Sequence, residues 1–218
     1  MTVMKVIEPL AKRKTGRPLS FDREAALHQA MLLFWRHGYE ATSVSALTQA
    51  MGITSPSLYT AFGDKKGLFL EAVQRYSAGS AAAEYIIDEA ATARQAAVAL
   101  LEGAAHAFTR DDMPPGCLLA SAAISCSDEA SDIRDELAAI RQRIEARLHQ
   151  KIVQAVAARE LSAETDADAL AAHTLAVIQG MSTLARDGAS RDKLTRITQL
   201  ALKAWPCCRF MGQWLILF

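Results

Sequence analysis

The sequence predicts an all-α protein of about nine helices, and three observations support this prediction. Of its 218 residues, 51% are hydrophobic but only 6% aromatic, and alanine is abundant. Apolar residues recur every three or four positions along several segments, most clearly between residues 131 and 159. No segment shows the apolar and polar alternation of a half-buried strand, so no sheet is expected.

Three short helices are expected near the N-terminus, each between a capping side chain and a glycine. An acidic or hydroxyl side chain at a helix start accepts hydrogen bonds from backbone N–H groups that have no partner within the helix, and glycine ends helices readily. The expected helices run from Asp22 to Gly38, from Thr42 or Ser43 to Gly52, and from Thr54 or Ser55 to Gly63.

A fourth helix is expected from Lys65, capped by Asp64, to about Ser77. Five further helical segments are expected over roughly 81–90 merging with 92–109, and over 117–127, 131–159, 166–186 and 190–205.

Charge is distributed unevenly along the chain. The net charge is zero, but residues 1–66 hold nine Lys and Arg against five Asp and Glu. Residues 1–20 include "KRKTGRPLS", which has charge, glycine and proline but no helical period, so we expect a basic flexible arm there. A basic end suggests an anionic partner, and the alternative is a solvated tail.

The second and third helices are joined by a tight turn at "MGIT" and predict a helix-turn-helix DNA-binding domain over residues 21–66. A recognition helix that enters the major groove needs small polar residues in its first turns, and hydroxyl or lysine groups at helix starts can bind phosphate. The DNA-binding candidates are Thr42, Ser43, Ser55, Pro56, Ser57, Tyr59, Thr60 and Lys65.

The stretch "FWRHGYEATSVSALTQAMGITSPSLYTAFGDKKGLF" resembles the DNA-binding region of the TetR family (AcrR-like) of bacterial transcriptional regulators. The resemblance covers about residues 22–70. It rests on many positions at fixed spacing: Phe34, Gly38, Tyr39, Thr42, Val44, Leu47, Ala50, Gly52, Leu58, Tyr59, Phe62, Lys65 and Leu68.

This resemblance implies a larger helical body over residues 67–206, which binds a small-molecule effector and forms a dimer through its last two helices. It further implies a ligand-responsive regulator, a repressor that binds a palindromic double-stranded DNA operator as a homodimer and is released by its effector. The alternatives are an architectural A·T-rich DNA-binding protein without an effector, and a helical small-molecule-binding protein or enzyme. No catalytic constellation is readable, so neither catalysis nor a cofactor is expected.

The arm offers a second DNA contact. "TGRP" resembles the Gly-Arg-Pro core of arms that lie in the narrow minor groove of A·T-rich DNA, where Arg17 would insert. The alternative is a solubilising tail.

Two apolar stripes near the C-terminus suggest a four-helix bundle across a two-fold axis, although packing within one chain has the same periodicity. The dimer-interface candidates are Ala169, Ala172, His173, Ala176, Gly180, Leu194, Ile197 and Ala201.

An effector pocket is expected between about residues 65 and 180, although residues of these types are more often ordinary core than ligand contacts. The candidates are Phe69, Val73, Tyr76, Leu101, Ala105, Phe108, Met113, Cys117, Leu118, Ile144 and Val177. Their side chains favour an apolar or aromatic effector. The histidines lack the spacing of a metal site, so no metal is expected.

Cys117 stands at the head of a predicted helix, a position that lowers the pKa of a thiol, so an exposed Cys117 could react with electrophiles or oxidants. "PGCLL" also resembles a segment of some TetR regulators that respond to reactive compounds. The alternative is a small buried side chain. Cys126 is expected on the opposite helix face, too far to pair with it.

The sequence shows no signal peptide and no apolar run long enough to span a membrane, so we expect a cytoplasmic protein with reduced thiols. The largely apolar tail, residues 207–218, has no assigned role. Packing on the body, a longer dimer contact and an altered reading frame stay open.

Overall fold

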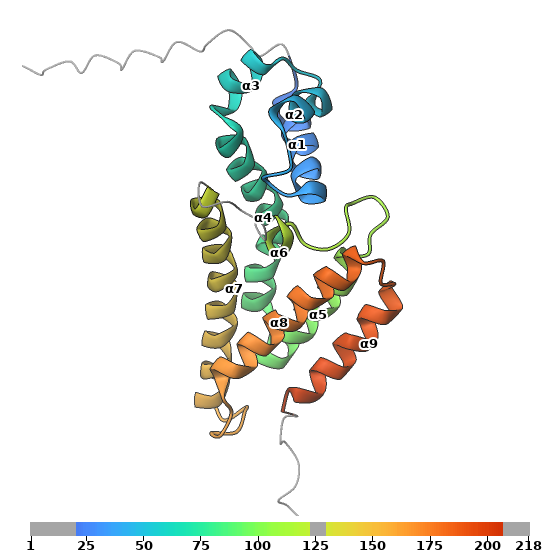
Figure 1. Cartoon of the computed structure of the whole chain (residues 1–218). Helices are drawn as coiled ribbons and strands as arrows, with labels where there is room; N and C mark the ends of the chain where they lie inside the picture. The colour runs from blue at the N-terminus through green and yellow to red at the C-terminus, as the bar shows by residue number, and fades with distance from the viewer. Residues whose placement is uncertain (1–20, 123–129, 207–218) are drawn as a thin grey trace, which may run out of the picture.

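The computed structural model describes residues 21–122 and 130–206, without the side chains of residues 79–82. This part of the chain holds nine α-helices, one short 3-10 helix and no strand, which confirms the all-α prediction (Figure 1). The helices are α1 (Arg23–His37), α2 (Val44–Met51), α3 (Ser55–Phe62), α4 (Lys65–Glu89), α5 (Ala93–Ala107), α6 (Leu118–Ser121), α7 (Ser131–Ala157), α8 (Ala167–Arg186), α9 (Arg191–Ala201) and the 3-10 helix η2 (Leu202–Ala204).

The first four helices begin at capping side chains, as the sequence predicts. The capping residues are Asp22, Ser43, Thr54 and Asp64, and each accepts at least one backbone N–H of its own helix. For the second and third helices the sequence allowed two capping residues each. The residues that cap them in the structure are Ser43 rather than Thr42, and Thr54 rather than Ser55. The side-chain oxygen, already in place beside the first turn, therefore fixes these helix starts.

The predicted end of the fourth helix is wrong. Helix α4 continues through Ser77 to Glu89. Residues 90–92 separate it from α5, which begins at Ala93. Residues 77–83 are small and contain no proline, so nothing local stops the helix. Ile87 is 1% exposed, and its packing against α5 and α7 adds stability to the extended helix.

The predicted helix over 117–127 is only partly visible. Its described part is the four residues of α6, and residues 123–129 lie outside the described residues.

One hydrophobic core joins the helix-turn-helix to the body. Phe34 of α1 packs edge-on against Phe69 of α4, with ring centroids 5.0 Å apart, and Tyr39 lies 5.1 Å from the same ring. The core continues to Leu118 of α6 and Ile133 of α7. Helix α4 therefore crosses the predicted domain boundary at residues 66 and 67 without a break and connects the two parts.

The other two cores lie in the body. Trp205 is 2% exposed in a core formed with α4, α5, α7 and α8, and its Nε1 donates to Thr174 Oγ1 over 3.2 Å. Leu101, Met181 and Leu194 belong to the core between α5, α8 and α9. Figure 1 shows α2 and α3 at one end of the molecule, with α8 and α9 away from them.

None of the helices in the described residues combines the length and apolar character needed to cross a membrane.

Candidate nucleic-acid interface and ligand cavity

Helix α3 presents a polar face to solvent. Leu58 and Phe62 are buried beneath it, at 0% and 5% exposure, whereas Ser55, Pro56 and Thr60 are exposed. Tyr59 is 50% exposed, a large fraction for an aromatic side chain. The buried residues hold α3 against α2 and α4, and the exposed ones are free of the core.

The hydroxyl groups of this region are held by short local hydrogen bonds. Ser57 Oγ lies 2.9 Å from Thr54 Oγ1, and Thr60 Oγ1 donates to the carbonyl oxygen of Pro56 over 2.8 Å. Ser43 Oγ accepts the Ala46 N–H over 3.1 Å. These bonds fix where the oxygens lie, which suits groups that contact phosphates or base edges.

Thr42 departs from its predicted role as a phosphate contact. Its side chain is 2% exposed, and its Oγ1 donates to the carbonyl oxygen of Gly38 over 2.6 Å. It therefore stabilises the turn between α1 and α2, and Ser43 is the exposed hydroxyl at this helix start.

Lys65 is half-buried. Its Nζ lies 4.4 Å from the centre of the Tyr39 ring and donates to the Glu40 carbonyl oxygen over 3.4 Å. Arg23, which sequence reasoning missed, binds Glu71 through Nη2 at 2.7 Å and donates to the Ala61 carbonyl oxygen at 3.1 Å. Arg23 thus ties α1 to the end of α3. No short motif marks it, because its partners lie 38 and 48 residues away.

The predicted DNA contact of Arg17 lies outside the described residues.

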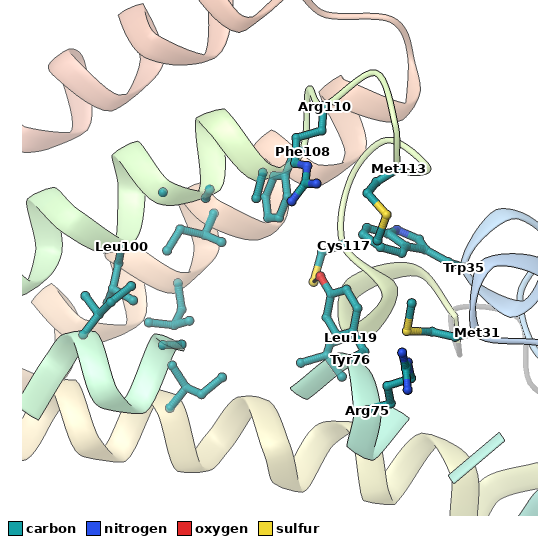
Figure 2. Close-up of a pocket in the computed structure, with 18 of the residues that line it drawn as sticks. Met31, Trp35, Arg75, Tyr76, Leu100, Phe108, Arg110, Met113, Cys117 and Leu119 are labelled. Carbon is teal, nitrogen blue, oxygen red and sulfur yellow. Dashed lines mark hydrogen bonds between the residues drawn. The ribbon is translucent and has the colours of Figure 1, made fainter. Parts of the chain in front are cut away.

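A cavity of about 540 Å³ lies between α1 and the helices of the body (Figure 2). Its volume is in the range of small-molecule sites. The cavity is lined by His28, Met31, Trp35, Arg75, Tyr76, Ala83, Ile86, Leu100, Gly103, Ala104, Ala107, Phe108, Arg110, Met113, Cys117, Leu119, Ile144, Leu175 and Ile178.

Five of the eleven predicted pocket residues line this cavity: Tyr76, Phe108, Met113, Cys117 and Ile144. The other six do not line it, and they belong to the hydrophobic cores: Phe69, Val73, Leu101, Ala105, Leu118 and Val177. Periodicity identifies the apolar face of a helix, but it does not show which part of that face packs in a core and which part borders a cavity. The predicted residues are therefore divided between the two.

The N-terminal unit also contributes to the cavity, which the sequence analysis missed. His28, Met31 and Trp35 of α1 line it, although the pocket was expected to begin near residue 65. Met31 and Trp35 are four residues apart on one helix face, and the same spacing also describes an ordinary core face.

Of the two alternatives for Cys117, the structure supports the small side chain packed against the core and not the reactive thiol of lowered pKa. Burial raises the pKa of the Cys117 thiol. The Tyr76 hydroxyl donates a hydrogen bond to Cys117 Sγ over 3.3 Å, which lowers the pKa, but the effect of burial is larger. Burial also raises the pKa of Tyr76 well above its ordinary value. Helix α6 is too short to offer a strong dipole, so the neutral thiol is favoured at pH 7.

The loop before α6 is tightly seated on α8. Gly116 has φ +79°, and a Cβ there would lie 2.7 Å from the Ser182 carbonyl oxygen. The Cys117 N–H donates to Ser182 Oγ over 2.8 Å. A side chain at position 116 would push the loop away, so glycine is needed for this contact.

An arginine of α8 links the body to the first helix. Arg186 donates to the carbonyl oxygens of Trp35 and Arg36, over 3.1 and 3.2 Å, and to Ser121 Oγ over 3.2 Å. It thereby satisfies carbonyl groups at the end of α1 that lack a partner within that helix.

The predicted dimer residues divide between the surface and the core. On α8, Ala169, His173, Ala176 and Gly180 are exposed and Ala172 is half-buried. On α9, Leu194 and Ala201 are buried against α5 and α8, and Ile197 is half-buried, so the first two pack within the chain. Leu200, which the sequence analysis did not select, is 65% exposed on the outer face of α9.

Within the described ranges, no three His, Cys, Asp or Glu side chains come close enough to hold a metal ion.

Comparison with known proteins decides the family. Residues 26–72 match the model of bacterial regulatory proteins of the tetR family, and residues 88–201 match the tetracyclin repressor-like C-terminal domain. The HTH-type transcriptional repressor ComR of Escherichia coli (strain K12) is 38% identical over 197 residues, which cover 89% of this chain and 94% of ComR. The chain belongs to the TetR family of bacterial transcriptional regulators.

Two further relatives of this family agree. The HTH-type transcriptional repressor BdcR of Escherichia coli (strain K12) is 34% identical over 123 residues, 56% of this chain and 62% of BdcR. A cysteine-substituted form of the TetR family regulator CifR, complexed with 26 bp double-strand operator DNA, superimposes with a TM-score of 0.83. It is 39% identical, and the match covers 87% of this chain and 100% of that one. The protein is therefore a DNA-binding transcriptional regulator.

Proposed function

We propose that the protein is a ligand-responsive repressor that binds a palindromic operator as a homodimer and has no enzymatic activity. Residues 21–66 read the DNA, and residues 67–206 hold the dimer contact and, together with α1, the effector. The observation that carries the proposal is the 540 Å³ cavity, which α1 of the DNA-binding unit shares with α4, α5, α7 and α8 of the body. Its occupancy can affect both parts of the chain at once.

The DNA contacts come from the exposed face of α3. Ser55, Ser57 and Thr60 offer hydroxyls to base edges and phosphates, and the Tyr59 hydroxyl reaches a phosphate. Ser43 and Lys65 flank α3 and contact the backbone. Proteins named as repressors among the relatives, and the operator complex of CifR, support this role.

The dimer contact is formed by α8 and α9. Ala169, Ala176 and Gly180 make an exposed face of small side chains on α8, which allows close approach of a second helix. Leu200 adds an exposed apolar side chain on α9. Two-fold symmetry then places two copies of α3 at the same side of the dimer.

Effector binding releases the operator by changing the separation of the two recognition helices. Successive major grooves on one side of the duplex are about 34–36 Å apart. Two recognition helices with another separation therefore cannot both enter their grooves. An effector does this only if it binds one of the two arrangements more tightly.

Selection from a random duplex library tests the proposal. The full-length purified protein should enrich a two-fold-symmetric sequence at physiological salt, where nonspecific phosphate binding is weakened. Enrichment of A·T-rich DNA without symmetry would support the architectural alternative and contradict the dimeric repressor. Folded protein that enriches no sequence would also contradict it.

A further inference from the structure

Arg186, in the last turn of α8, joins three helices through one guanidinium group. Its Nη1 donates to the Trp35 carbonyl oxygen over 3.1 Å and to Ser121 Oγ over 3.2 Å, and its Nη2 donates to the Arg36 carbonyl oxygen over 3.2 Å. Trp35 and Arg36 belong to the last turn of α1, and Ser121 is the last residue of α6. Figure 1 shows α6 close to the end of α1, with α8 below both.

The two carbonyl groups of α1 are available because the chain turns away at the end of that helix. The Tyr39 N–H would bond to Trp35 if the helix continued, but it donates to the Ala122 carbonyl oxygen, just after α6, over 3.1 Å. Carbonyl groups in a last helical turn carry partial negative charge and need donors from outside the helix. The guanidinium of Arg186 supplies these donors together with a positive charge.

The aliphatic part of Arg186 is seated against the loop before α6. A Cβ built at Gly116 would lie 2.9 Å from Arg186 Cγ, so the backbone of this loop lies directly against the side chain. The Cys117 N–H donates to Ser182 Oγ over 2.8 Å and holds the loop on α8. Among the described residues Arg186 forms no ion pair, so no carboxylate there competes for its guanidinium.

These hydrogen bonds fix an angle, which the hydrophobic core does less strictly. In the core between α1 and the body, Phe34 packs on Phe69, and packed helices can slide over such contacts by small amounts. A guanidinium is planar and its N–H groups point in fixed directions, so bonds to two successive carbonyl groups hold one orientation of α1 relative to α8. Arg186 is exposed, so the bonds add little to the stability of the fold itself.

We propose that Arg186 is a positioning residue for operator binding, which sets the angle between the DNA-binding unit and α8. The inference rests on the proposed function, in which α8 forms the dimer contact. Arg186 lies on the same helix as Gly180 of that contact, fewer than two turns away. The Arg186 junction in each subunit therefore helps to set the separation of the two recognition helices, along a path through α8 that does not pass through α4.

Palindromes that differ only in the spacing of their half-sites test the proposal on the full-length protein. The series comprises the palindrome selected from the random library, the same palindrome lengthened or shortened by one base pair, and a duplex with a single half-site. One base pair changes the separation of the half-sites by about 3.4 Å and rotates one half-site about the duplex axis. The wild type should bind the selected palindrome most tightly.

Arg186→Met removes the guanidinium and keeps an aliphatic side chain against Gly116. It should reduce the preference for the selected palindrome over the altered ones by roughly five-fold, which corresponds to about one net hydrogen bond. Its affinity for the single half-site should stay within about two-fold of the wild type, because the DNA-contacting face is unchanged. Arg186→Lys keeps the charge but lacks the planar fork, so it should restore part of the preference.

Arg191→Met is the matched control. Arg191 donates to Thr109 Oγ1 over 3.1 Å and to the Thr109 carbonyl oxygen over 3.3 Å, so it ties α9 to the chain after α5 and does not touch α1. It should keep the spacing preference of the wild type. If Arg186→Met does not fold, Arg186→Gln, which also lacks the charged fork, replaces it with the same expected result.

The outcomes separate this inference from the proposed function. An unchanged spacing preference in the Arg186 variant, an equal loss of affinity for half-site and palindrome, or an equal effect of Arg191→Met would overturn the inference and leave the dimeric repressor unaffected. A wild-type protein without any spacing preference would overturn both, because the two recognition helices would then have no fixed separation.

Discussion

Tyr59 is the most exposed aromatic side chain of α3, and its hydroxyl is the part that the proposed interface uses. Tyr59→Phe should weaken operator binding roughly three- to ten-fold, because one hydrogen bond to a phosphate is lost while the ring is kept. The measurement is a titration of labelled operator at fixed salt.

Tyr85 is the matched control, because it is 63% exposed on α4, outside the proposed interface. Tyr85→Phe should leave operator affinity unchanged. Equal effects of the two substitutions would contradict the assignment of Tyr59 to the DNA.

Cys117 yields a prediction about reactivity. With the other three cysteines replaced by serine, its alkylation by iodoacetamide at pH 7.5 should be at least about ten-fold slower than that of free cysteine. Burial raises its pKa, so the thiolate fraction is lower, and the rate should still be rising above the ordinary thiol pKa, where the rate for free cysteine levels off. A rate above that of free cysteine would instead support the reactive thiol of lowered pKa.

For single residues, the sequence indicates which side chains could take part in a site, but not whether each is exposed or buried. Ser43 and Thr42 are adjacent hydroxyls with the same apparent role, yet only Ser43 is exposed. The difference arises because Thr42 Oγ1 reaches the Gly38 carbonyl oxygen across the turn. Likewise, the position of Cys117 at a helix start can be read from the sequence, whereas the burial that raises its pKa depends on residues distant in sequence.

Among the elements, the contact of α4 with the end of α3 is the most constrained. A Cβ at Gly67 would lie 2.4 Å from the Phe62 carbonyl oxygen, which is backbone and cannot rotate away. Gly67→Ala should therefore lower the free energy of unfolding by roughly 1–3 kcal/mol, as overpacking does, and weaken operator binding by displacing α3. Urea denaturation and operator titration measure both effects.

Gly103 of α5 provides the control, because nothing lies within 4 Å of a Cβ built there. Gly103→Ala should raise the free energy of unfolding by about 0.5–1 kcal/mol. Destabilisation by Gly103→Ala equal to that by Gly67→Ala would show that the Phe62 contact is not the cause.

Helix starts were predictable and some helix ends were not. Asp22, Ser43, Thr54 and Asp64 act through bonds that span two or three residues, so a local motif suffices. The end of α4 depends on the burial of Ile87 in a core built from α5, α7 and α8, which local sequence does not contain.

For the whole molecule, dimer formation through α8 is the first testable property. Gly180→Glu places a charge on the exposed face, where a Cβ meets nothing within 4 Å in the same chain, so the subunit itself should fold. The variant should sediment as a monomer and bind the operator roughly a hundred-fold more weakly, because the two half-sites are no longer bound together.

Val153→Glu on α7 is the control, since Val153 is 45% exposed outside the proposed interface. It should remain dimeric. A dimeric Gly180→Glu variant with unchanged operator affinity would contradict the α8 interface.

The cavity illustrates what sequence leaves out at this scale. Tyr76, Cys117 and Ile144 were among the predicted pocket residues, whereas Trp35 was not. Its role at the cavity follows from the packing of α1 against a helix of the body, and Arg186 and Trp35 are 151 residues apart in the chain.

We expect the cavity and the DNA-binding face to be coupled through α1, and the operator affinity of a variant with a filled cavity is the measurement that tests this coupling. Ala104 lines the cavity, so Ala104→Phe occupies part of its volume without any knowledge of the natural effector. The variant should be a folded dimer that binds the selected operator at least about ten-fold more weakly than the wild type. A folded dimer with wild-type operator affinity would contradict the coupling.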